Sequence, residues 1–290
     1  MIVICQYVSL NIINDQIRSI YIACITKEVS MLKTQRHNEI LEILKKDKFS
    51  QVSELSARLF VSQPTMRRDL NYLEKQGYVR RSHGGVMLVN EKINAPFLFR
   101  SGIRSTEKIK ICKAAASLVS SDSLIFTDAS STALCISDYL MDIKNVTAVS
   151  NGLLACQRMS ENGVQVYSTG GKLLKDSLAF VGKQAQNSVQ NFNADIMFFS
   201  SSSLSSDGII SDYSEEETEL RLAMLKKSAI KVFLCDSRKF DSVSAFNMCS
   251  LAEIDMLITD SPISEEIVLK YGFKLIRQEE ALIYTKQISR

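Results

Sequence analysis

Runs of β-branched or apolar residues alternate with helical runs through most of the chain, and this alternation restricts the fold more than any other feature of the sequence. Strands separated by helices form mostly parallel sheets that helices cover on both faces. The sequence therefore predicts an α/β protein whose larger domain, residues 106–290, contains a Rossmann-like, mostly parallel sheet. The expected strands are 123–127, 146–150, 164–168, 195–199, 231–235, 256–259 and 274–276, and the expected helices are 106–118, 132–140, 152–160, 182–192, 215–229 and 263–271.

Polar residues follow five of these expected strands. The first polar loop begins at Asp128 and runs through small hydroxyl residues into a helix, whose free amides and positive dipole end suit a phosphate. Ligands bind at the carboxyl ends of parallel strands, so converging polar loops predict a site for a small anionic, hydroxylated ligand. Each loop taken alone is also compatible with an ordinary surface turn. The candidate ligand contacts are Asp128, Ser130, Ser131, Thr132, Ser150, Asn151, Gly170, Gly171, Lys172, Asp236 and Lys239.

A second, smaller domain is expected over residues 31–89. Helical spacing of apolar residues begins near Gln35, and a second short helix covers 53–59. Ser62 can cap a third helix that runs to about Gln76 and buries a stripe formed by Met66, Leu70 and Leu73. Two short strands, 78–82 and 86–89, then flank a turn at 83–85. This order of elements predicts a winged helix-turn-helix domain.

The smaller domain is basic. Residues 31–86 contain eleven Lys and Arg against six Asp and Glu, a net charge of +5, whereas the whole chain carries +3. The smaller domain, called the head below, is basic, whereas the rest of the chain is slightly acidic. This difference indicates that the head binds a polyanion. The alternative for the arginines of the third helix is ion pairing with Asp69 or Glu74. The candidate DNA contacts lie off the apolar stripe or on the wing, and they are Ser62, Gln63, Thr65, Arg67, Arg68, Asn71, Arg80, Arg81 and His83.

The head resembles the DNA-binding domain of the DeoR-type bacterial transcriptional regulators. The segment 61–70 has the pattern V-S-x-x-T-x-R-R-D-L, and the segment 81–85 has the pattern R-x-H-G-G. The resemblance implies that the helix beginning at Ser62 enters the major groove of double-stranded operator DNA. It also implies that the protein acts as a homo-oligomer on repeated half-sites.

This resemblance covers about residues 33–285. DeoR-type regulators carry an effector domain similar to ribose-5-phosphate isomerase, which senses phosphorylated sugars, so the resemblance implies a repressor of sugar-metabolism genes that such a ligand controls. Asp128 and residues 130–132 match a D-x-G-[ST]-[ST]-T loop, except that Ser130 stands where the family has Gly, and the run 200–203 replaces a stretch that contains Gly. A D-[SR]-x-K-F element at 236–240 favours Lys239 as the ligand's cation over Lys172 and Arg238. A surface ion pair between Lys239 and Asp236 or Asp241 is the alternative.

Two other classes of function compete with a ligand-controlled regulator. The first is a sugar-phosphate isomerase-like enzyme with a fused DNA-binding head. Both histidines, His37 and His83, lie in the head, so the effector half has no histidine for proton transfer. The second is an architectural DNA-binding protein without a ligand response, against which the polar loops argue. We therefore expect no catalytic residue, no cofactor and no metal site.

The remaining expectations concern location and domain boundaries. The seven cysteines are never closer than fourteen residues, which argues against a zinc knuckle or a disulfide framework and favours a reducing cytoplasm. We expect no membrane span and interpret residues 1–30 as an N-terminal extension upstream of a second start at Met31; a membrane-surface or partner-binding segment is the alternative. Residues 90–105 lack a clear period and are expected to form the linker.

Overall fold

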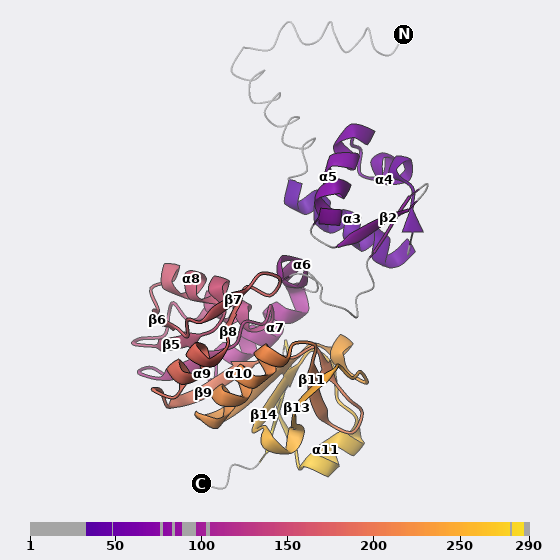
Figure 1. The fold of residues 1–290 in the computed structure, drawn as a ribbon. Helices are drawn as coiled ribbons and strands as arrows, with labels where there is room; N and C mark the ends of the chain where they lie inside the picture. The colour runs from indigo at the N-terminus through magenta and orange to yellow at the C-terminus, as the bar shows by residue number, and fades with distance from the viewer. Residues whose placement is uncertain are drawn as a thin grey trace, which may run out of the picture. The chain divides into compact units, whose positions relative to one another are not determined.

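The chain divides into two compact units, Met1–Asn90 and Glu91–Arg290. The computed structural model describes residues 33–47, 49–75, 78–82, 85–88, 97–102, 105–278 and 280–286. The expected N-terminal extension, His83 of the expected wing and the first part of the expected linker lie outside these described residues. The two units are described separately below (Figure 1).

The first unit is a winged helix-turn-helix, as predicted. Its strands form an antiparallel sheet in the order β1-β3-β2. Ile40, Leu55 and Met66 are fully buried and belong to different helices, so the three helices share one core. The predicted stripe on the third helix is confirmed, and the Ser62 hydroxyl accepts a hydrogen bond from the Thr65 amide at 3.3 Å. The elements are α3 (Lys33–Asp47), β1 (Phe49–Ser50), α4 (Val52–Arg58), α5 (Gln63–Lys75), β2 (Val79–Ser82) and β3 (Gly85–Leu88).

A buried ion pair joins α3 to α5. The Asp69 carboxylate accepts from Arg36 Nε at 2.6 Å and lies 2.9 Å from His37 Nε2. Burial alone would raise the pKa of Asp69, but the hydrogen bonds from Arg36 and His37 and their charges lower it below its ordinary value. Asp69 is therefore occupied inside the head and cannot neutralise the arginines beside it on α5.

The turn between α4 and α5 is strained. Phe60 has a φ of 52°, in the left-handed region. The Val61 amide donates to the Ser56 carbonyl at 3.0 Å and the Phe60 amide donates to the Ala57 carbonyl at 3.4 Å, the hydrogen-bond pattern of a Schellman motif. Glycine is the usual residue at this position because it has no Cβ. The Phe60 side chain is 95% exposed, so burial does little to offset the strain.

The second unit is built on an eight-stranded sheet in the order β15-β16-β14-β12-β9-β4-β5-β6. The strands from β14 to β6 run parallel, and β16 and β15 complete one edge in antiparallel orientation. From β4 the chain moves to β5 and β6 in one direction and later to β9, β12 and β14 in the other. The point where the direction reverses lies between β4 and β9. The strands are β4 (Leu124–Thr127), β5 (Thr147–Ser150), β6 (Gln165–Ser168), β9 (Ala194–Phe199), β12 (Ser228–Cys235), β14 (Met256–Thr259), β15 (Lys274–Gln278) and β16 (Leu282–Thr285).

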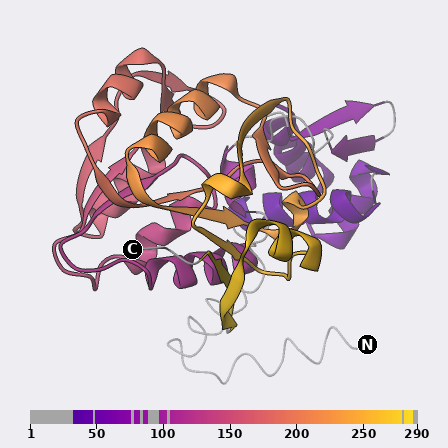
Figure 2. The same cartoon turned by 90° about the horizontal axis from the view of Figure 1, so that it is seen from below.

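Helices cover both faces of this sheet, as the alternating pattern predicts (Figures 1 and 2). Ile125 and Phe198 face a core shared with α7 and α8, whereas their neighbours Phe126 and Phe199 face a second core shared with α9 and α10. None of the described helices is long and apolar enough to cross a membrane. The helices are α6 (Phe97–Gly102), α7 (Ser105–Ala116), the 3-10 helix η2 (Ala133–Tyr139), α8 (Leu153–Glu161), α9 (Lys183–Val189), α10 (Glu215–Lys226), the 3-10 turns η3 (Ser237–Lys239) and η4 (Leu251–Glu253), and α11 (Glu265–Tyr271).

Several elements differ from the sequence-based expectations. The segment 132–140 forms a 3-10 helix instead of an α-helix, and the second part of the expected linker folds as α6. A hairpin and a three-stranded sheet were not predicted, because their strands are only two to five residues long and carry no clear period. These elements are β7 (Lys172–Leu174) with β8 (Ala179–Val181), and β10 (Ser203–Leu204), β11 (Ile209–Asp212) and β13 (Phe246–Ser250).

Replacing Phe60 by glycine is expected to stabilise the head. The left-handed conformation costs a non-glycine residue about 1–2 kcal/mol, and the greater freedom of glycine in the unfolded chain cancels part of the gain, so we expect a net gain of about 0.5–1 kcal/mol. Calorimetric unfolding of the full chain measures this gain as a rise in the melting temperature of the head. Phe60→Ala is the control, because it removes the exposed ring but keeps the strain. Equal stability of Phe60→Gly and Phe60→Ala would contradict the strain.

Candidate functional site

A cavity of about 640 Å³ opens where β4, β9 and β12 end. This is the carboxyl edge of the sheet at the reversal of strand order, the position where open α/β sheets bind ligands. The loop after each of the three strands lines it. Further walls come from α6, α7, the β7–β8 turn, the end of β11 and the start of α10.

The floor of the cavity is a buried cluster of one arginine and three carboxylates. Arg221 on α10 is only 2% exposed. Its guanidinium donates to Asp128 at 2.8 Å, to Asp212 at 2.8 Å and to Glu217 at 3.0 Å. Burial opposes its charge, but the three carboxylates outweigh burial and raise the pKa of Arg221.

Asp128 and Asp212 extend this cluster to the neighbouring backbone. Asp128 accepts hydrogen bonds from the amides of Ser130 at 3.1 Å and Ser200 at 3.2 Å, which fixes the loops after β4 and β9 relative to each other. Asp212 accepts from the Ser202 hydroxyl at 2.8 Å. Burial raises the pKa of Asp212, but the Arg221 charge and the Ser202 hydrogen bond bring it below its ordinary value. Both carboxylates therefore connect Arg221 to the loops that surround the cavity.

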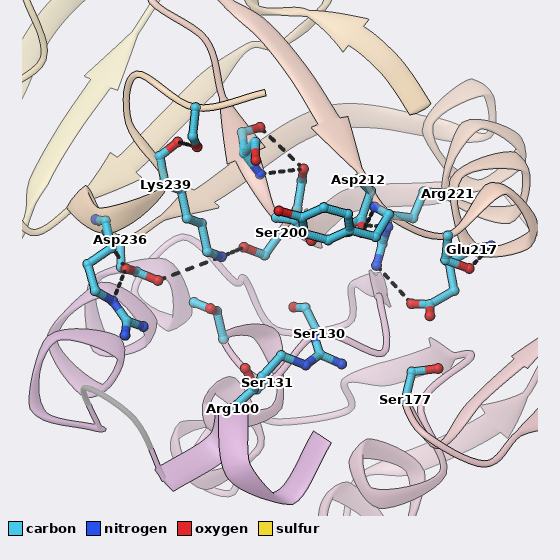
Figure 3. Close-up of a pocket in the computed structure, with 18 of the residues that line it drawn as sticks. Arg100, Ser130, Ser131, Ser177, Ser200, Asp212, Glu217, Arg221, Asp236 and Lys239 are labelled. Atoms are coloured by element: carbon cyan, nitrogen blue, oxygen red, sulfur yellow. Dashed lines mark hydrogen bonds and ion pairs between the residues drawn. The ribbon is translucent and has the colours of Figure 1, made fainter. Parts of the chain in front are cut away.

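The opposite side of the cavity is cationic (Figure 3). Lys239 Nζ donates to the Ser200 hydroxyl at 2.6 Å and lies 3.7 Å from Asp236. Arg238 Nε donates to Asp236 at 3.1 Å. Burial raises the pKa of Asp236, but the charges of Lys239, Arg238 and Lys108 together lower it to about 2. The charges of three basic side chains therefore act on this one carboxylate.

Lys108 is the most deeply buried of these cations. It lies on α7, is 2% exposed, and donates to the Ser131 hydroxyl at 3.0 Å and to the Arg100 carbonyl. Burial lowers its pKa to about 7, with repulsion from Lys239 and Arg238 acting in the same direction and Asp236 opposing them. The pKa of this side chain therefore lies close to neutral pH.

Hydroxyl groups occupy the space between the two charged sides. Ser130 and Ser131 follow β4, and the run 200–203 follows β9. Within the described part of the chain, the buried Oγ1 of Thr132 and Oγ of Ser177 have no hydrogen-bond partner, and both residues line the cavity. Buried hydroxyls are normally paired, so these two are suited to a bound polar ligand.

The structure brings five of the predicted ligand residues to this cavity. Asp128 lies beneath the cavity floor and organises it without lining it. The ligand contacts themselves remain predictions. The predicted residues that line the cavity are Ser130, Ser131, Thr132, Asp236 and Lys239.

Five other predicted residues do not line this cavity, because β5 and β6 lie on the far side of β4 from β9. The Ser150 hydroxyl donates to the Thr127 carbonyl, and the Asn151 amide donates to the carbonyl of Phe180 in β8. Gly170 and Gly171 have positive φ, and Lys172 pairs with Glu216 at 3.0 Å. Their role in ligand binding stays a prediction, although they lie outside this cavity: Ser150, Asn151, Gly170, Gly171 and Lys172.

Sequence reasoning missed Lys175 of the β7–β8 turn and three further basic residues of the cavity: Arg100, Lys108 and Arg221. All three lie on helices, where a single basic residue resembles an ordinary exposed one. For Arg221 a weak signal existed, because Glu217 precedes it by one helical turn. No signal in the sequence distinguishes Lys108 from the exposed Lys110 and Lys113 of the same helix.

The second candidate surface is on the head. Gln63, Arg67, Arg68 and Asn71 are exposed on α5, opposite the buried stripe. The alternative of ion pairing within α5 is not supported, since Asp69 binds Arg36 and the Glu74 carboxylate accepts from the Arg81 amide at 3.0 Å. Ser62 is exposed and Thr65 is half-buried at the start of this helix.

The wing is attached to the same helix. Arg81 Nη1 donates to Asn71 Oδ1 at 2.6 Å, so β2 and α5 present their polar side chains together. The side chain of Arg80 and the whole of His83 lie outside the described residues. Exposed amide and guanidinium groups on one helix and its wing form a surface suited to base edges and phosphates.

A metal site is not evident in the described ranges: no group of three or more His, Cys, Asp and Glu is close enough to hold an ion. The cations of the cavity instead suit an anionic ligand.

Comparison with known proteins identifies both units. Residues 36–92 match the DeoR-like helix-turn-helix domain, and residues 103–261 match the DeoR C terminal sensor domain. The chain is 32% identical over 243 residues to the HTH-type transcriptional regulator GolR of Listeria innocua, a match that covers 83% of this chain and 96% of that protein. It is 29% identical over 233 residues to the glycerol-3-phosphate regulon repressor of Escherichia coli, covering 80% and 92% respectively.

Among solved structures, the sensor unit is similar to ribose 5-phosphate isomerase A from Neisseria gonorrhoeae and to the isomerase from Methanocaldococcus jannaschii. Each match has 12% identity and a TM-score of 0.36, and covers 63% of this chain and 76% or 80% of the isomerase. A similarity of this extent carries no conclusion about activity.

Lys108 is expected to make stability depend on pH. Its pKa is about 7 in the folded chain against 10.5 as an ordinary lysine, so between these values the unfolded chain binds more protons and stability rises with pH. Relative to Lys108→Met, the free energy of unfolding of the unmodified protein should increase by up to about 1.4 kcal/mol per pH unit from pH 7 to 10. Urea unfolding at several pH values measures this difference. Lys110→Met, on the exposed face of α7, is the control, and its free energy of unfolding should follow that of the unmodified protein at every pH. If the free energy of Lys108→Met also follows that of the unmodified protein across this range, the lowered pKa of Lys108 is refuted.

Proposed function

Since this chain belongs to the DeoR family of transcriptional regulators, we propose that it is a repressor of sugar-metabolism genes controlled by a phosphorylated sugar. The observation that carries the proposal is the division of charge in the sensor cavity. Lys239 lies on one side beside Asp236, which also binds Arg238, and Asp212 and Glu217 lie on the other, with serine hydroxyls between them (Figure 3).

A phosphorylated sugar has the chemistry that this division of charge favours. Its phosphate would lie near Lys239 and Ser131, where cations and hydroxyl donors are available. Its hydroxyl groups would donate to Asp212 and Glu217, which both line the cavity beside Arg221. The partnerless hydroxyls of Thr132 and Ser177 add further groups that a polyol can satisfy.

The relatives support the same class of effector. One of them is named for a glycerol-3-phosphate regulon, and glycerol 3-phosphate is itself a phosphorylated polyol. The same relative is named a repressor, which supports repression as the mode of action of this chain.

We infer that the sensor does not catalyse sugar-phosphate isomerisation. A general base works best with a pKa near the operating pH. The charges of neighbouring cations lower the pKa of Asp236 to about 2 and hold the pKa of Asp212 below its ordinary value. Lys108 has a pKa near 7, but its side-chain nitrogen is engaged by Ser131 and the Arg100 carbonyl. These groups are better suited to binding than to proton transfer.

The remaining parts of the proposal concern the assembly. We propose that the protein acts as a homo-oligomer in the cytoplasm, because helix-turn-helix proteins read paired half-sites of operator DNA. We further propose that residues 31–89 form the DNA-binding domain and residues 106–290 the effector domain, because each has its own buried core.

Footprinting tests the proposal directly. Full-length protein is bound to the DNA upstream of its own gene, with and without ribose 5-phosphate, fructose 6-phosphate and glycerol 3-phosphate. Thermal shift with the same compounds measures binding independently, since a ligand at 100 times its Kd stabilises the folded state by about 2.7 kcal/mol. A protected operator whose occupancy no sugar phosphate alters, together with no thermal shift, would reject ligand control.

Lys239→Ala is expected to abolish the response to the sugar phosphate while operator affinity without ligand stays unchanged. A hydrogen bond to a charged group contributes about 1.5–3 kcal/mol, so the affinity for the ligand should fall by at least about tenfold. The measurement is calorimetric titration combined with operator binding. Lys172→Ala is the matched control, because Lys172 pairs with Glu216 and does not line the cavity.

The two lysine variants distinguish a specific contact of Lys239 with the ligand from the general effect of removing one positive charge. If Lys172→Ala loses the response and Lys239→Ala keeps it, the cavity is not the effector site.

Arg67→Ala and Arg68→Ala are each expected to weaken operator binding by at least about 1 kcal/mol without altering the fold, because both side chains are exposed on α5. A variant that loses a phosphate contact should also flatten the dependence of binding on salt by about one unit, whereas loss of a base contact should not. Binding titrations at several salt concentrations measure both effects. Arg58→Ala is the control, since Arg58 is neutralised by Asp47 and Glu54. Unchanged binding in both α5 variants would remove this helix from the interface.

A further inference from the structure

Helix α6 is part of the cavity wall, and it is the first described element after β3 of the head. Arg100 of α6 lines the cavity, and Figure 3 shows its side chain beside Ser130 and Ser131. Phe97, at the start of α6, is buried in the sensor core, and its amide donates to the Asp176 carbonyl at 2.8 Å. Asp176 belongs to the β7–β8 turn, which also lines the cavity. Both ends of α6 are therefore attached to elements that would surround a ligand.

Lys108 connects α6 to the loop after β4. The same ammonium donates to the Ser131 hydroxyl and to the Arg100 carbonyl. The last carbonyls of a helix lack partners within the helix, and a cation near them is favourable. α6 has only six residues, too few to be stable alone, so its order depends on such outside contacts.

The strength of this connection depends on the charge around Lys108. Burial and the charges of Lys239 and Arg238 oppose its protonation, while Asp236 and Cys135 favour it. An anion held by Lys239 would offset the repulsion and favour the charged ammonium. A charged donor makes a stronger hydrogen bond than a neutral amine, so the Arg100 carbonyl would be held more tightly when the cavity is occupied.

We propose that Lys108 is a positioning residue that transmits occupancy of the sensor cavity to α6, and that the order of α6 is the signal passed toward the head. The proposal rests on the proposed function, because it requires an anionic ligand in this cavity. It adds the element that reports binding and the side chain that links the element to the ligand loop.

Hydrogen exchange on the full-length protein tests the proposal with inorganic phosphate, the anionic group common to the candidate ligands. Calorimetric titration first sets a saturating concentration for each variant. In the unmodified protein, phosphate should slow exchange of the α6 amides by about fivefold, the effect of replacing a neutral hydrogen bond by a charged one. Lys108→Met should lose this slowing, Lys108→Arg should restore at least part of it, and Lys110→Met on the exposed face of α7 should retain it in full.

The possible outcomes separate the role of Lys108 from the proposed function of the sensor. Phosphate that binds but leaves α6 exchange unchanged overturns the role of Lys108 and leaves the sensor site standing. Faster α6 exchange in Lys108→Met, with the same slowing by phosphate as in the unmodified protein, also overturns it, because Lys108 would then be only a structural support. Failure of phosphate and of the sugar phosphates to bind at all overturns the proposed function, and the signal with it. Unchanged exchange in α10 of each variant establishes that the sensor is folded.

Discussion

The buried guanidinium of Arg221 connects three segments that the hydrogen bonds of the main sheet do not hold together. Asp128 directly follows β4, Asp212 ends β11 and Glu217 lies in the first turn of α10, and all three carboxylates bind this one side chain. Asp128 also accepts from the Ser200 amide after β9. Removing one member of a buried ionic cluster costs about 3–5 kcal/mol, because it leaves charge without compensation. The anionic side of the cavity is thus fixed before any ligand arrives, and the cations on the other side can respond to one.

The order of strands decided which parts of the site the sequence could predict. The alternation of strands and helices was sufficient for the fold class and for every parallel strand, because each strand is a local run of residues. The sequence does not reveal that β5 and β6 lie on one side of β4 and β9 and β12 on the other. For this reason the loops at Ser150 and Gly170, which are polar like the loop at Ser130, were placed in one site although they do not line the cavity.

Sequence reasoning missed several residues of the site for a second physical reason, which is that their partners are distant in the sequence. Arg221 is separated from Asp128 by 93 positions, and its burial depends on three carboxylates that only the fold assembles. In the head the same limit applies to Asp69. Its neighbours on α5 made it a candidate partner for Arg67 and Arg68, but the fold pairs it with Arg36, 33 positions away. Local pattern predicts which face of a helix is buried, whereas the partner of a buried charge depends on long-range packing.

The strength of the contact at Lys108 limits how the sensor can control the head. A ligand shifts an equilibrium only by the difference between its affinities for the two states. One hydrogen bond that changes from neutral to charged contributes about 1 kcal/mol, or about fivefold, whereas a nearly complete switch needs about 5.5 kcal/mol. A single α6 helix therefore cannot release the operator by this contact alone. In a homo-oligomer the contacts of several sensors would act on one DNA complex. Control of DNA binding by this route would consequently need the homo-oligomer proposed above.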